Sequence, residues 1–229
     1  MHVKFLCTQD IEGVFPEPKP AIRMAPSFYK KLQPKFGPAP NNNTVKRCVP
    51  FLDALSQGFI IPLWADLYVK ARDGEIETEM GSTKESLHWH DNVQIKGHPL
   101  EGTPYTQNAL KFRNPWVVET EENVSCLFTA PFNHLETRFK ILDGVVDTDT
   151  YYNHINFPFI WTAGEGDFLI KQGTPLVQVI PFYRQEKLTH SVEVADQKKL
   201  DISYNRMGAR ITNGYREQFW HKRKQNEEE

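Results

Sequence analysis

Long hydrophobic runs are absent from this sequence of 229 residues. No window approaches the roughly 18 consecutive apolar residues of a membrane-spanning helix, so we expect no membrane partner. The first eight residues become polar too early for a secretory signal peptide. A dominant charge is missing as well, because 27 basic residues stand against 29 acidic ones and leave a formal net charge of −2. We therefore expect no strong nucleic-acid footprint.

Cysteine is scarce. Cys7, Cys48 and Cys126 are odd in number and widely spaced along the chain. A disulfide framework requires pairs, so this pattern favours reduced thiols, which are typical of the cytosol. We expect a cytoplasmic protein.

Several catalytic and binding motifs are also missing. The sequence has no Gly-x-Ser-x-Gly nucleophile elbow, no phosphate-cradling Lys-Ser/Thr loop and no dinucleotide fingerprint. It has no paired-cysteine zinc spacing and no internal repeat. These absences exclude the enzyme and repeat classes that depend on those motifs.

Aromatic residues are plentiful, at 5 Trp, 8 Tyr and 15 Phe, and they favour strands and dense packing. Residues 64–70 and 75–80 alternate between apolar and polar side chains, and Asp73-Gly74 between them is typical of a hairpin turn. Further short strands are predicted at residues 3–5, 59–64, 115–120, 124–129, 157–161, 168–171 and 176–180. The pattern predicts a mainly β fold, a single compact barrel or sandwich.

The two ends of the chain differ from this middle part. Eight of the 16 prolines lie between Pro16 and Pro50. This pattern predicts that residues 1–43 form an extended amino-terminal arm packed on the domain. Residues 44–184 predict the β domain. Residues 185–229 predict a helical segment with a charged tail, in which apolar side chains recur every three or four positions and Asn213-Gly214 marks a break.

One central segment resembles the dUTPase and dCTP-deaminase family. Residues 141–149 contain a Gly-hydrophobic-Asp-x-Asp stretch, and residues 168–180 contain a strand, a Lys-x-Gly turn and a Gln-bearing apolar strand. Residues 64–68 resemble a Gly-Tyr-Asp-Leu motif of that family more faintly. The resemblance covers about residues 115–183 and implies a β-clip fold.

The same resemblance implies a nucleotide site. The family uses the first aspartate of its Asp-x-Asp element to orient a water, which makes Asp147 a candidate general base. Phosphate chemistry also needs cationic donors, usually with Mg²⁺. The other residues implied in ligand binding are Asp66, Arg138, Asp149, Tyr151 and Gln178.

The sequence departs from the family pattern in three places. After Asp149 the family has a Tyr and a Gly, whereas this sequence has Thr150 and Tyr151. Residues 130–134 replace the Arg-Ser-Ser phosphate motif, and a Gly-rich carboxyl-terminal motif is missing. The resemblance therefore implies nucleotide binding and leaves hydrolysis open. An alternative interpretation treats Asp147 and Asp149 as turn residues whose carboxylates accept bonds from nearby backbone N–H groups.

A second resemblance covers about residues 1–184. Residues 44–55, 58–64 and 135–149 are similar to an uncharacterised protein family of tailed phages that infect marine bacteria. This resemblance brings no activity with it. It implies expression in the cytosol of a bacterial host, or association with the virion.

A possible metal site lies at His88 and His90. On a strand these two side chains point to the same face and could chelate one ion. Cupin-like non-haem iron enzymes use such a His-x-His pair, so Fe²⁺ is the metal that this alternative requires.

Three functions follow from the sequence. The first is a divergent dUTPase-like nucleotide-binding protein. The second is a non-enzymatic assembly or virion-associated protein, a homo-oligomer whose arm and tail bind neighbouring copies. The third is the iron enzyme built on His88 and His90.

Overall fold

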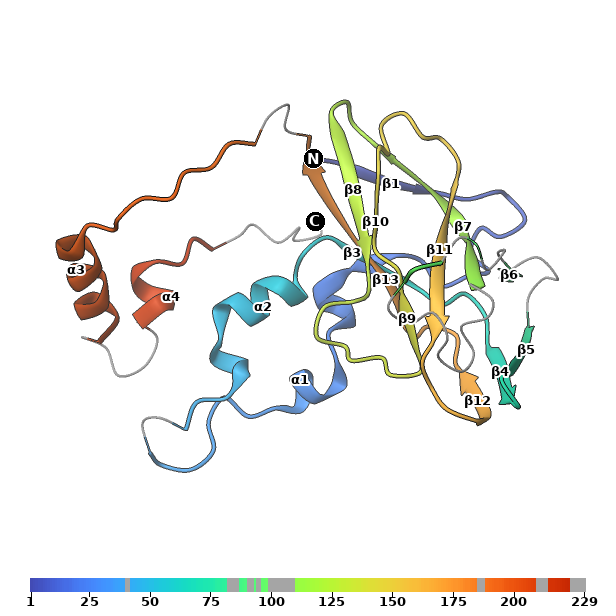
Figure 1. Cartoon of the computed structure of the whole chain (residues 1–229), viewed down its shortest axis with the longest axis horizontal. Helices are drawn as coiled ribbons and strands as arrows, with labels where there is room; N and C mark the ends of the chain where they lie inside the picture. Colours follow the sequence, from blue (N-terminus) through green and yellow to red (C-terminus); the bar gives the residue numbers. More distant parts are fainter. Residues whose placement is uncertain are drawn as a thin grey trace. The chain divides into compact units, whose positions relative to one another are not determined.

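The computed structural model describes residues 1–39, 42–81, 87–89, 93, 96–98, 110–184, 188–208 and 214–222. The chain forms two compact units (Figure 1). The β unit comprises Met1–Met24 and Gln57–Arg184, and the helical unit comprises Ala25–Ser56 and Gln185–Glu229. The helical unit thus combines part of the predicted arm, the start of the predicted β domain and the predicted carboxyl-terminal segment.

The described part of the β unit contains three antiparallel sheets. The first has the order β1-β7-β11-β9, with β6 also paired to β7; the second has the order β10-β8-β13-β3-β2; the third has the order β12-β4-β5. No sheet of the described residues closes on itself. The strands are β1 (Val3–Leu6), β2 (Lys19–Pro20), β3 (Phe59–Pro62), β4 (Leu67–Arg72), β5 (Glu75–Met80), β6 (Leu87–Trp89), β7 (Leu110–Thr120), β8 (Val124–Thr129), β9 (Phe139–Ile141), β10 (Gly144–Val146), β11 (His154–Trp161), β12 (Gly166–Ile170) and β13 (Pro175–Tyr183).

All three sheets contribute to one hydrophobic core. Phe112 of β7 is fully buried, stacks on Phe159 of β11 at 4.3 Å and meets Trp64 edge-on at 6.1 Å. Val177 of β13 and Val69 of β4 belong to the same cluster. Aromatic pairs of this kind add about 0.5–1.5 kcal/mol beyond the area that they bury, which explains the large aromatic content of the sequence.

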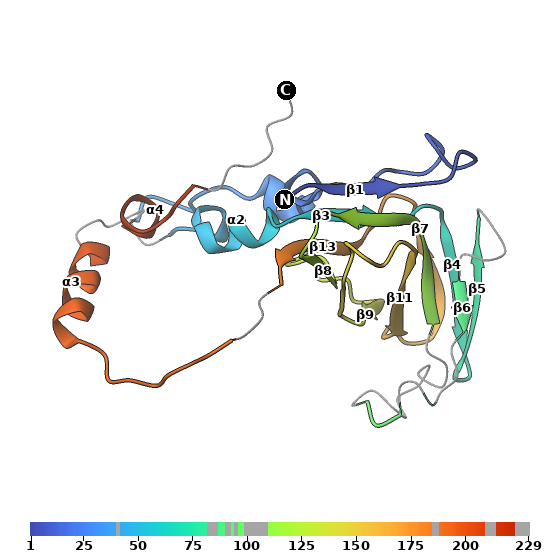
Figure 2. The ribbon, with the colours of Figure 1, turned by 90° about the horizontal axis from the view of Figure 1, so that it is seen from above.

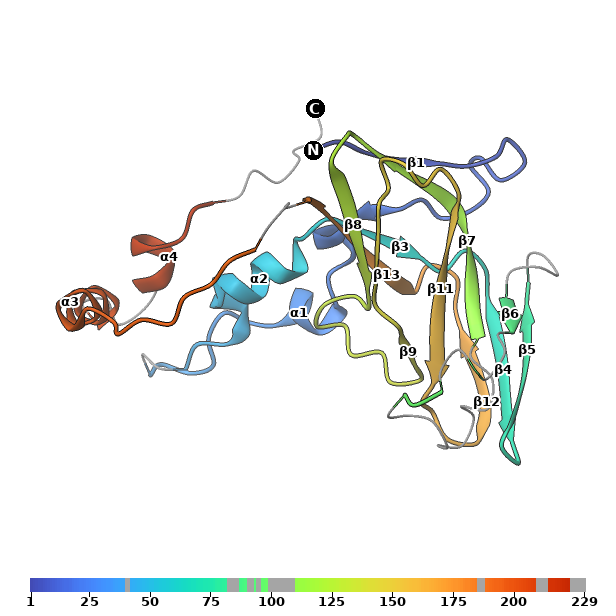
Figure 3. The same cartoon turned by 45° about the horizontal axis from the view of Figure 1, so that its top comes forward.

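The hairpin β4–β5 shows how the local pattern fixes the structure. Along β4 the side chains alternate strictly between buried and exposed. Asp73 and Gly74 have φ of 53° and 81°, the left-handed pair that a two-residue hairpin turn requires. Figures 2 and 3 show this hairpin at one side of the β unit, apart from β8 and β13.

The helical unit has five described helical segments: α1 (Ser27–Lys31), the 3-10 turn η2 (Val45–Arg47), α2 (Val49–Leu55), α3 (Gln197–Gly208) and α4 (Gly214–Gln218). Tyr29 stacks on Phe51 at 5.6 Å. The indole N–H of Trp220 donates to Asp53 Oδ2 at 3.1 Å. This contact joins the two sequence segments that make up the unit. A further 3-10 turn, η1 (Ala21–Met24), belongs to the β unit.

The mainly β fold class is confirmed, and so is the Asp73-Gly74 hairpin. The carboxyl-terminal segment contains the two helices at Gln197–Gly208 and Gly214–Gln218, whereas its residues 188–196 form no helix. None of the described helices is both long enough and apolar enough to cross a membrane.

Candidate functional site

The connection between β8 and β9 folds around a hollow of about 330 Å³, which we call the β8–β9 pocket. Its polar contributors include Asn133, His134, Lys140 and Asp143. Its apolar contributors are Ala130, Pro131, Phe132, Leu135, Phe139, Ile141, Pro175 and Leu176. A concave site with apolar walls and a few convergent polar groups is the usual form of a small-molecule site.

The backbone of this loop is strained. Asn133 and Leu135 have φ of 60° and 56°, in the left-handed region. Asn enters that region readily, but it costs Leu135 about 1–2 kcal/mol, and such strain persists only where the surroundings hold it. Two side chains that the sequence proposed as ligand-binding residues, Gln178 and Arg138, provide this support.

Gln178 fastens the start of the loop. Its side chain is 1% exposed, in the middle of β13. Its Oε1 accepts a hydrogen bond from the Phe132 backbone N–H at 2.8 Å, and its Nε2 donates to the Gln57 carbonyl at 2.7 Å. The amide therefore positions the pocket wall, because both of its polar atoms are bonded to backbone.

Arg138 fastens the end of the loop. Its guanidinium donates to both carboxylate oxygens of Glu136, at 2.8 and 2.7 Å, and to the Leu169 carbonyl at 2.9 Å. Burial of Glu136 opposes ionisation, but the hydrogen bonds from the Arg138 side chain and backbone outweigh it and lower the pKa of that carboxyl. The side-chain hydrogen bonds of Arg138 are therefore made to Glu136 in the loop and to Leu169 in β12.

Asp149 is paired with an arginine that the sequence analysis did not identify. Both of its oxygens accept bonds from Arg184, the residue that follows β13, and Oδ2 also accepts the Asn123 N–H at 3.0 Å. The carboxylate is only 5% exposed. The bonds from Arg184 lower the pKa of Asp149 to about 2.

Asp147 lies beside this pair and is more open. Its Oδ1 accepts a bond from the Ser125 hydroxyl at 2.6 Å and lies 3.4 Å from Arg184 Nη1. Its side chain is 59% exposed. Its carbonyl accepts the backbone N–H groups of Thr150 and Tyr151, so this segment forms a turn.

The remaining proposed ligand residues lie elsewhere. Asp66 Oδ1 accepts the Gln172 N–H at 2.7 Å, in the turn before β13. Asp149 is bonded beyond the other end of β13, which has nine residues and spans about 30 Å. Tyr151 is 44% exposed. Asp147 and Asp149 are therefore brought together, whereas Asp66 and Arg138 are not brought to them.

The proposed iron ligands are only partly described. His88 Nε2 lies 3.3 Å from Arg113 Nη1 on the neighbouring strand β7. His90 lies outside the described residues. Within the described ranges, no three His, Cys, Asp or Glu side chains group closely enough to hold a metal ion.

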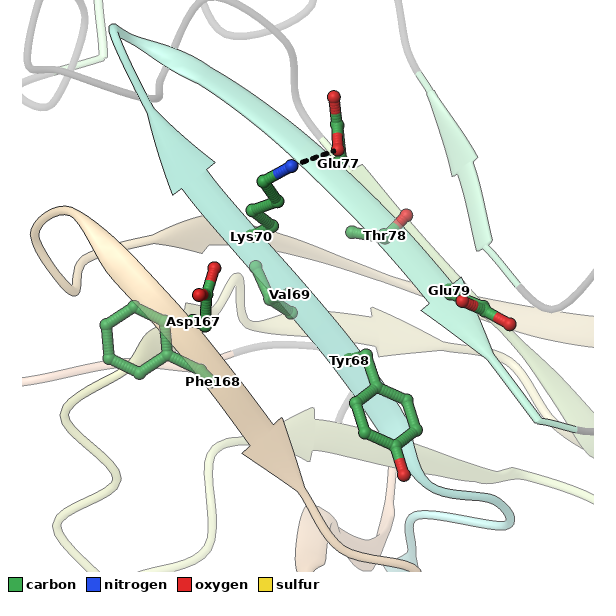
Figure 4. A pocket seen from close by; sticks show the side chains of 8 residues that line it. All are labelled: Tyr68, Val69, Lys70, Glu77, Thr78, Glu79, Asp167 and Phe168. Carbon is green, nitrogen blue, oxygen red and sulfur yellow. Dashed lines mark hydrogen bonds and ion pairs between the residues drawn. The ribbon is translucent and has the colours of Figure 1, made fainter.

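A second, shallower hollow of about 490 Å³ lies on the third sheet (Figure 4). Tyr68 and Lys70 of β4, Glu77 and Glu79 of β5, and Asp167 of β12 surround it. Lys70 Nζ bonds Glu77 at 3.4 Å. This hollow is a surface feature of a sheet face, and it has no buried polar group of the kind that supports the β8–β9 pocket.

Sequence reasoning missed the residues that line the β8–β9 pocket. It treated residues 130–134 as a segment that lacks a phosphate motif. The available signal was a Pro-Phe-Asn stretch between two strands, which is typical of a turn but does not predict a pocket.

No protein-family model matches the chain, and no curated protein matches it. Among solved structures, those of phage dUTPases match the chain. A mutant dUTPase from phage phi11 of S. aureus, described with a structural Mg(II) ion, is 10% identical, with a TM-score of 0.34 over 78% of this chain and 96% of that one. A mutant dUTPase of Staphylococcus bacteriophage 80alpha with dUpNHpp is 10% identical, with a TM-score of 0.33 over 80% of this chain and 92% of that one. At TM-scores of this size, the backbones differ too much for the transfer of a site residue by residue.

Proposed function

We propose that the β unit binds a deoxynucleotide in the β8–β9 pocket and does not hydrolyse it. The observation that carries this proposal is the pocket itself: about 330 Å³ of space beside a strained loop that Gln178 and Arg138 hold in place. Pockets for small ligands start at about this size. The resemblance to the dUTPase family supplies the ligand class.

The lining residues suit the two chemical parts of a nucleotide. Phe132 and Phe139, with the neighbouring prolines, offer apolar and aromatic surface to a base and its sugar. Lys140 and His134 offer cationic or N–H groups to phosphate oxygens. Asp143 offers a carboxylate to a Mg²⁺ ion that arrives with the phosphates, since Mg²⁺ is usually bound through one or two carboxylates plus substrate phosphates.

The position of Asp147 argues against hydrolysis. Asp143 lines the pocket at the start of β10, and Asp147 follows the end of β10. The three residues of β10 lie between them, so the Cα atoms of the two aspartates are about 13 Å apart. A general base must lie within hydrogen-bond reach of the water that it activates, so this separation supports binding without a contribution of Asp147 to hydrolysis.

The test is a thermal-shift series on the full chain with dUMP, dUDP and dUTP, each with Mg²⁺. A ligand at 100 times its Kd stabilises the native state by about 2.7 kcal/mol, which raises the Tm of a protein of this size by about 5–10 °C. We expect that shift for one of the three nucleotides. We expect Lys140→Ala to lose it, and no phosphate to be released.

Two control variants make the result specific. Lys171→Ala removes an exposed lysine from a turn outside the pocket, and Asp147→Ala removes the sequence-proposed base. Both should keep the shift. A Tm shift that disappears in Asp147→Ala and survives in Lys140→Ala would mean that the nucleotide binds at Asp147 instead of in the β8–β9 pocket. The absence of a Tm shift with any nucleotide would refute the proposal.

The phage family, the bacterial cytosol and the virion remain predictions of the sequence resemblance. Iron binding by His88 and His90 also remains a prediction, which metal analysis of the purified chain would check.

A further inference from the structure

We propose that helix α3 docks on the outer face of the sheet β12-β4-β5 of a second copy of this chain. This contact goes beyond nucleotide binding, because it uses two surfaces outside the β8–β9 pocket. Each surface lacks what the other provides: the sheet face is acidic and the helix is basic, and both carry exposed apolar side chains.

The sheet face, which we call the acidic face, is defined by strand register. Tyr68, Lys70 and Arg72 alternate on the exposed side of β4. Their cross-strand neighbours on β5 and β12 point the same way and are Glu75, Glu77, Glu79, Asp167 and Leu169. Four carboxylates face two cations, a net charge of −2.

Two carboxylates on this face stay available for a partner. Lys70 pairs with Glu77, and Arg72 pairs with Asp167 at 2.7 Å. Within the described part of the chain, Glu75 and Glu79 have no ion-pair partner. Tyr68, 52% exposed, lies across from Glu79 and borders the hollow seen in Figure 4.

Helix α3 is amphipathic and has no buried residue. Leu200, Tyr204 and Met207 recur at helical spacing and form an apolar strip along which a hollow of about 370 Å³ runs. Tyr204 is 82% exposed and Leu200 is 50% exposed. Such a strip normally lies against another surface, because its burial is what stabilises a short helix in water.

The charges of α3 complement the acidic face. Lys198, Lys199 and Arg206 stand against Asp201, a net charge of +2. Helical geometry places Lys199 and Arg206 on one side of the apolar strip, about 10 Å apart along the axis. Glu75 and Glu79 are about 13 Å apart along β5. The long lysine and arginine side chains span this difference, so two ion pairs can form while the strip covers Tyr68 and Leu169.

A second copy is the occupant because both surfaces belong to this chain and both are exposed in it. The contact joins two different patches, so it forms a reciprocal dimer, a ring where the rotation between copies closes, or an open filament where it does not. Its ionic component implies that association weakens as salt screens the charges.

The test is charge exchange followed by sedimentation of the full chain over a range of concentrations. The wild type should form a concentration-dependent oligomer. Lys199→Glu with Arg206→Glu should raise its dissociation constant by about tenfold or more, because like charges would then face each other across the contact. Glu75→Lys with Glu79→Lys should do the same. A chain with all four substitutions should recover association.

The matched control is Lys198→Glu, which changes the same charge on the opposite side of α3 and should leave the oligomer intact. All five positions are exposed, so circular dichroism should show folded variants. A monomeric wild type, an equal effect of Lys198→Glu, or failure of the four-fold variant to reassociate would each overturn the proposal. A monomeric protein in which the amides of α3 are protected from hydrogen exchange would mean that the helix packs against its own chain, and this result would also overturn the proposal.

Discussion

At the scale of single residues, Arg184 determines how the Asp147–Asp149 segment is held. The sequence pattern singled out the two aspartates and left out the arginine, because Arg184 is 35 positions from Asp149 and no local periodicity connects them. Gln178 shows the same limitation. It positions the pocket wall through a hydrogen bond to the Gln57 carbonyl, and Gln57 is 121 positions away in the sequence. A motif can identify such residues, but their roles depend on contacts that only the fold creates.

The Asp149–Arg184 pair gives a prediction about pH. Because the folded pKa of Asp149 lies at about 2, below the ordinary value of 3.8 for this side chain, the pair stabilises the native state fully at pH values above the unfolded pKa. That stabilisation falls as the pH drops from about 4 towards 2, where the folded carboxylate takes up its proton. Asp149→Asn should therefore lower the Tm at pH 7, and the difference from the wild type should shrink at pH 2–3.

The matched variant is Asp147→Asn, whose carboxylate is 59% exposed and makes a longer contact with Arg184. It should change the Tm at pH 7 less than Asp149→Asn does. Thermal melts of the three proteins between pH 2 and pH 7 measure both effects. A gap between the wild type and Asp149→Asn that stays constant across this range would show that the ionised carboxylate is not the stabilising group.

At the scale of elements, the sequence predicted most strands because alternation is a local signal. Residues 75–80 and 124–129 were predicted as strands and are β5 and β8. The prediction for β7 began at Pro115, whereas the strand begins at Leu110. Proline usually ends a strand because it cannot donate a hydrogen bond. Here the Asn114 side chain bonds both the N–H and the carbonyl of Trp116, opposite a register shift in β11, so the strand continues through the proline.

Helix α2 was missed for a related reason. Its sequence is apolar throughout most of its length, and short apolar runs do not distinguish a strand from a helix. Pro50 in the first turn was the available helix signal, since proline is favoured there. The β8–β9 pocket could not be predicted at this scale, because residues of β9, β13 and the loop line it together.

The link between α2 and β3 gives a prediction about a glycine. Gly58 has φ of +60°, and a Cβ at this position would lie 1.9 Å from the Val179 carbonyl oxygen in β13. Gly58→Ala should lower the free energy of unfolding by about 2–5 kcal/mol, because the left-handed conformation and the overlap both cost energy. Urea denaturation of the full chain measures this loss.

Gly74→Ala is the matched control. Gly74 has φ of +81°, but a Cβ there meets no atom within 4 Å. This variant carries only the conformational cost of about 1–2 kcal/mol. Equal losses for the two variants would mean that β3 and β13 do not approach each other as closely as described.

At the scale of the whole molecule, the two units differ in how they are stabilised. The β unit holds the core cluster shared by its three sheets. The helical unit relies on a few aromatic contacts and on the bond between Trp220 and Asp53, and its longest helix buries no residue. Burial in the core resists local opening, whereas exposed helices open readily. The composition of the sequence predicted a hydrophobic core but not the division into two units, because the helical unit combines two segments, Ala25–Ser56 and Gln185–Glu229, that are far apart in the sequence.

Hydrogen exchange tests this difference and its consequence for assembly. In dilute solution we expect the amides of α3 to exchange fastest and those of β8 and β13 slowest, because no residue of α3 is buried and the two strands are paired on both sides. At concentrations that favour association, exchange should slow in α3 and in β5 together, since the proposed contact covers both. Exchange in β8 serves as the internal control and should not change. Slowing in α3 without slowing in β5 would mean that the helix finds another surface, and strong protection of α3 in dilute solution would mean that it folds against its own chain.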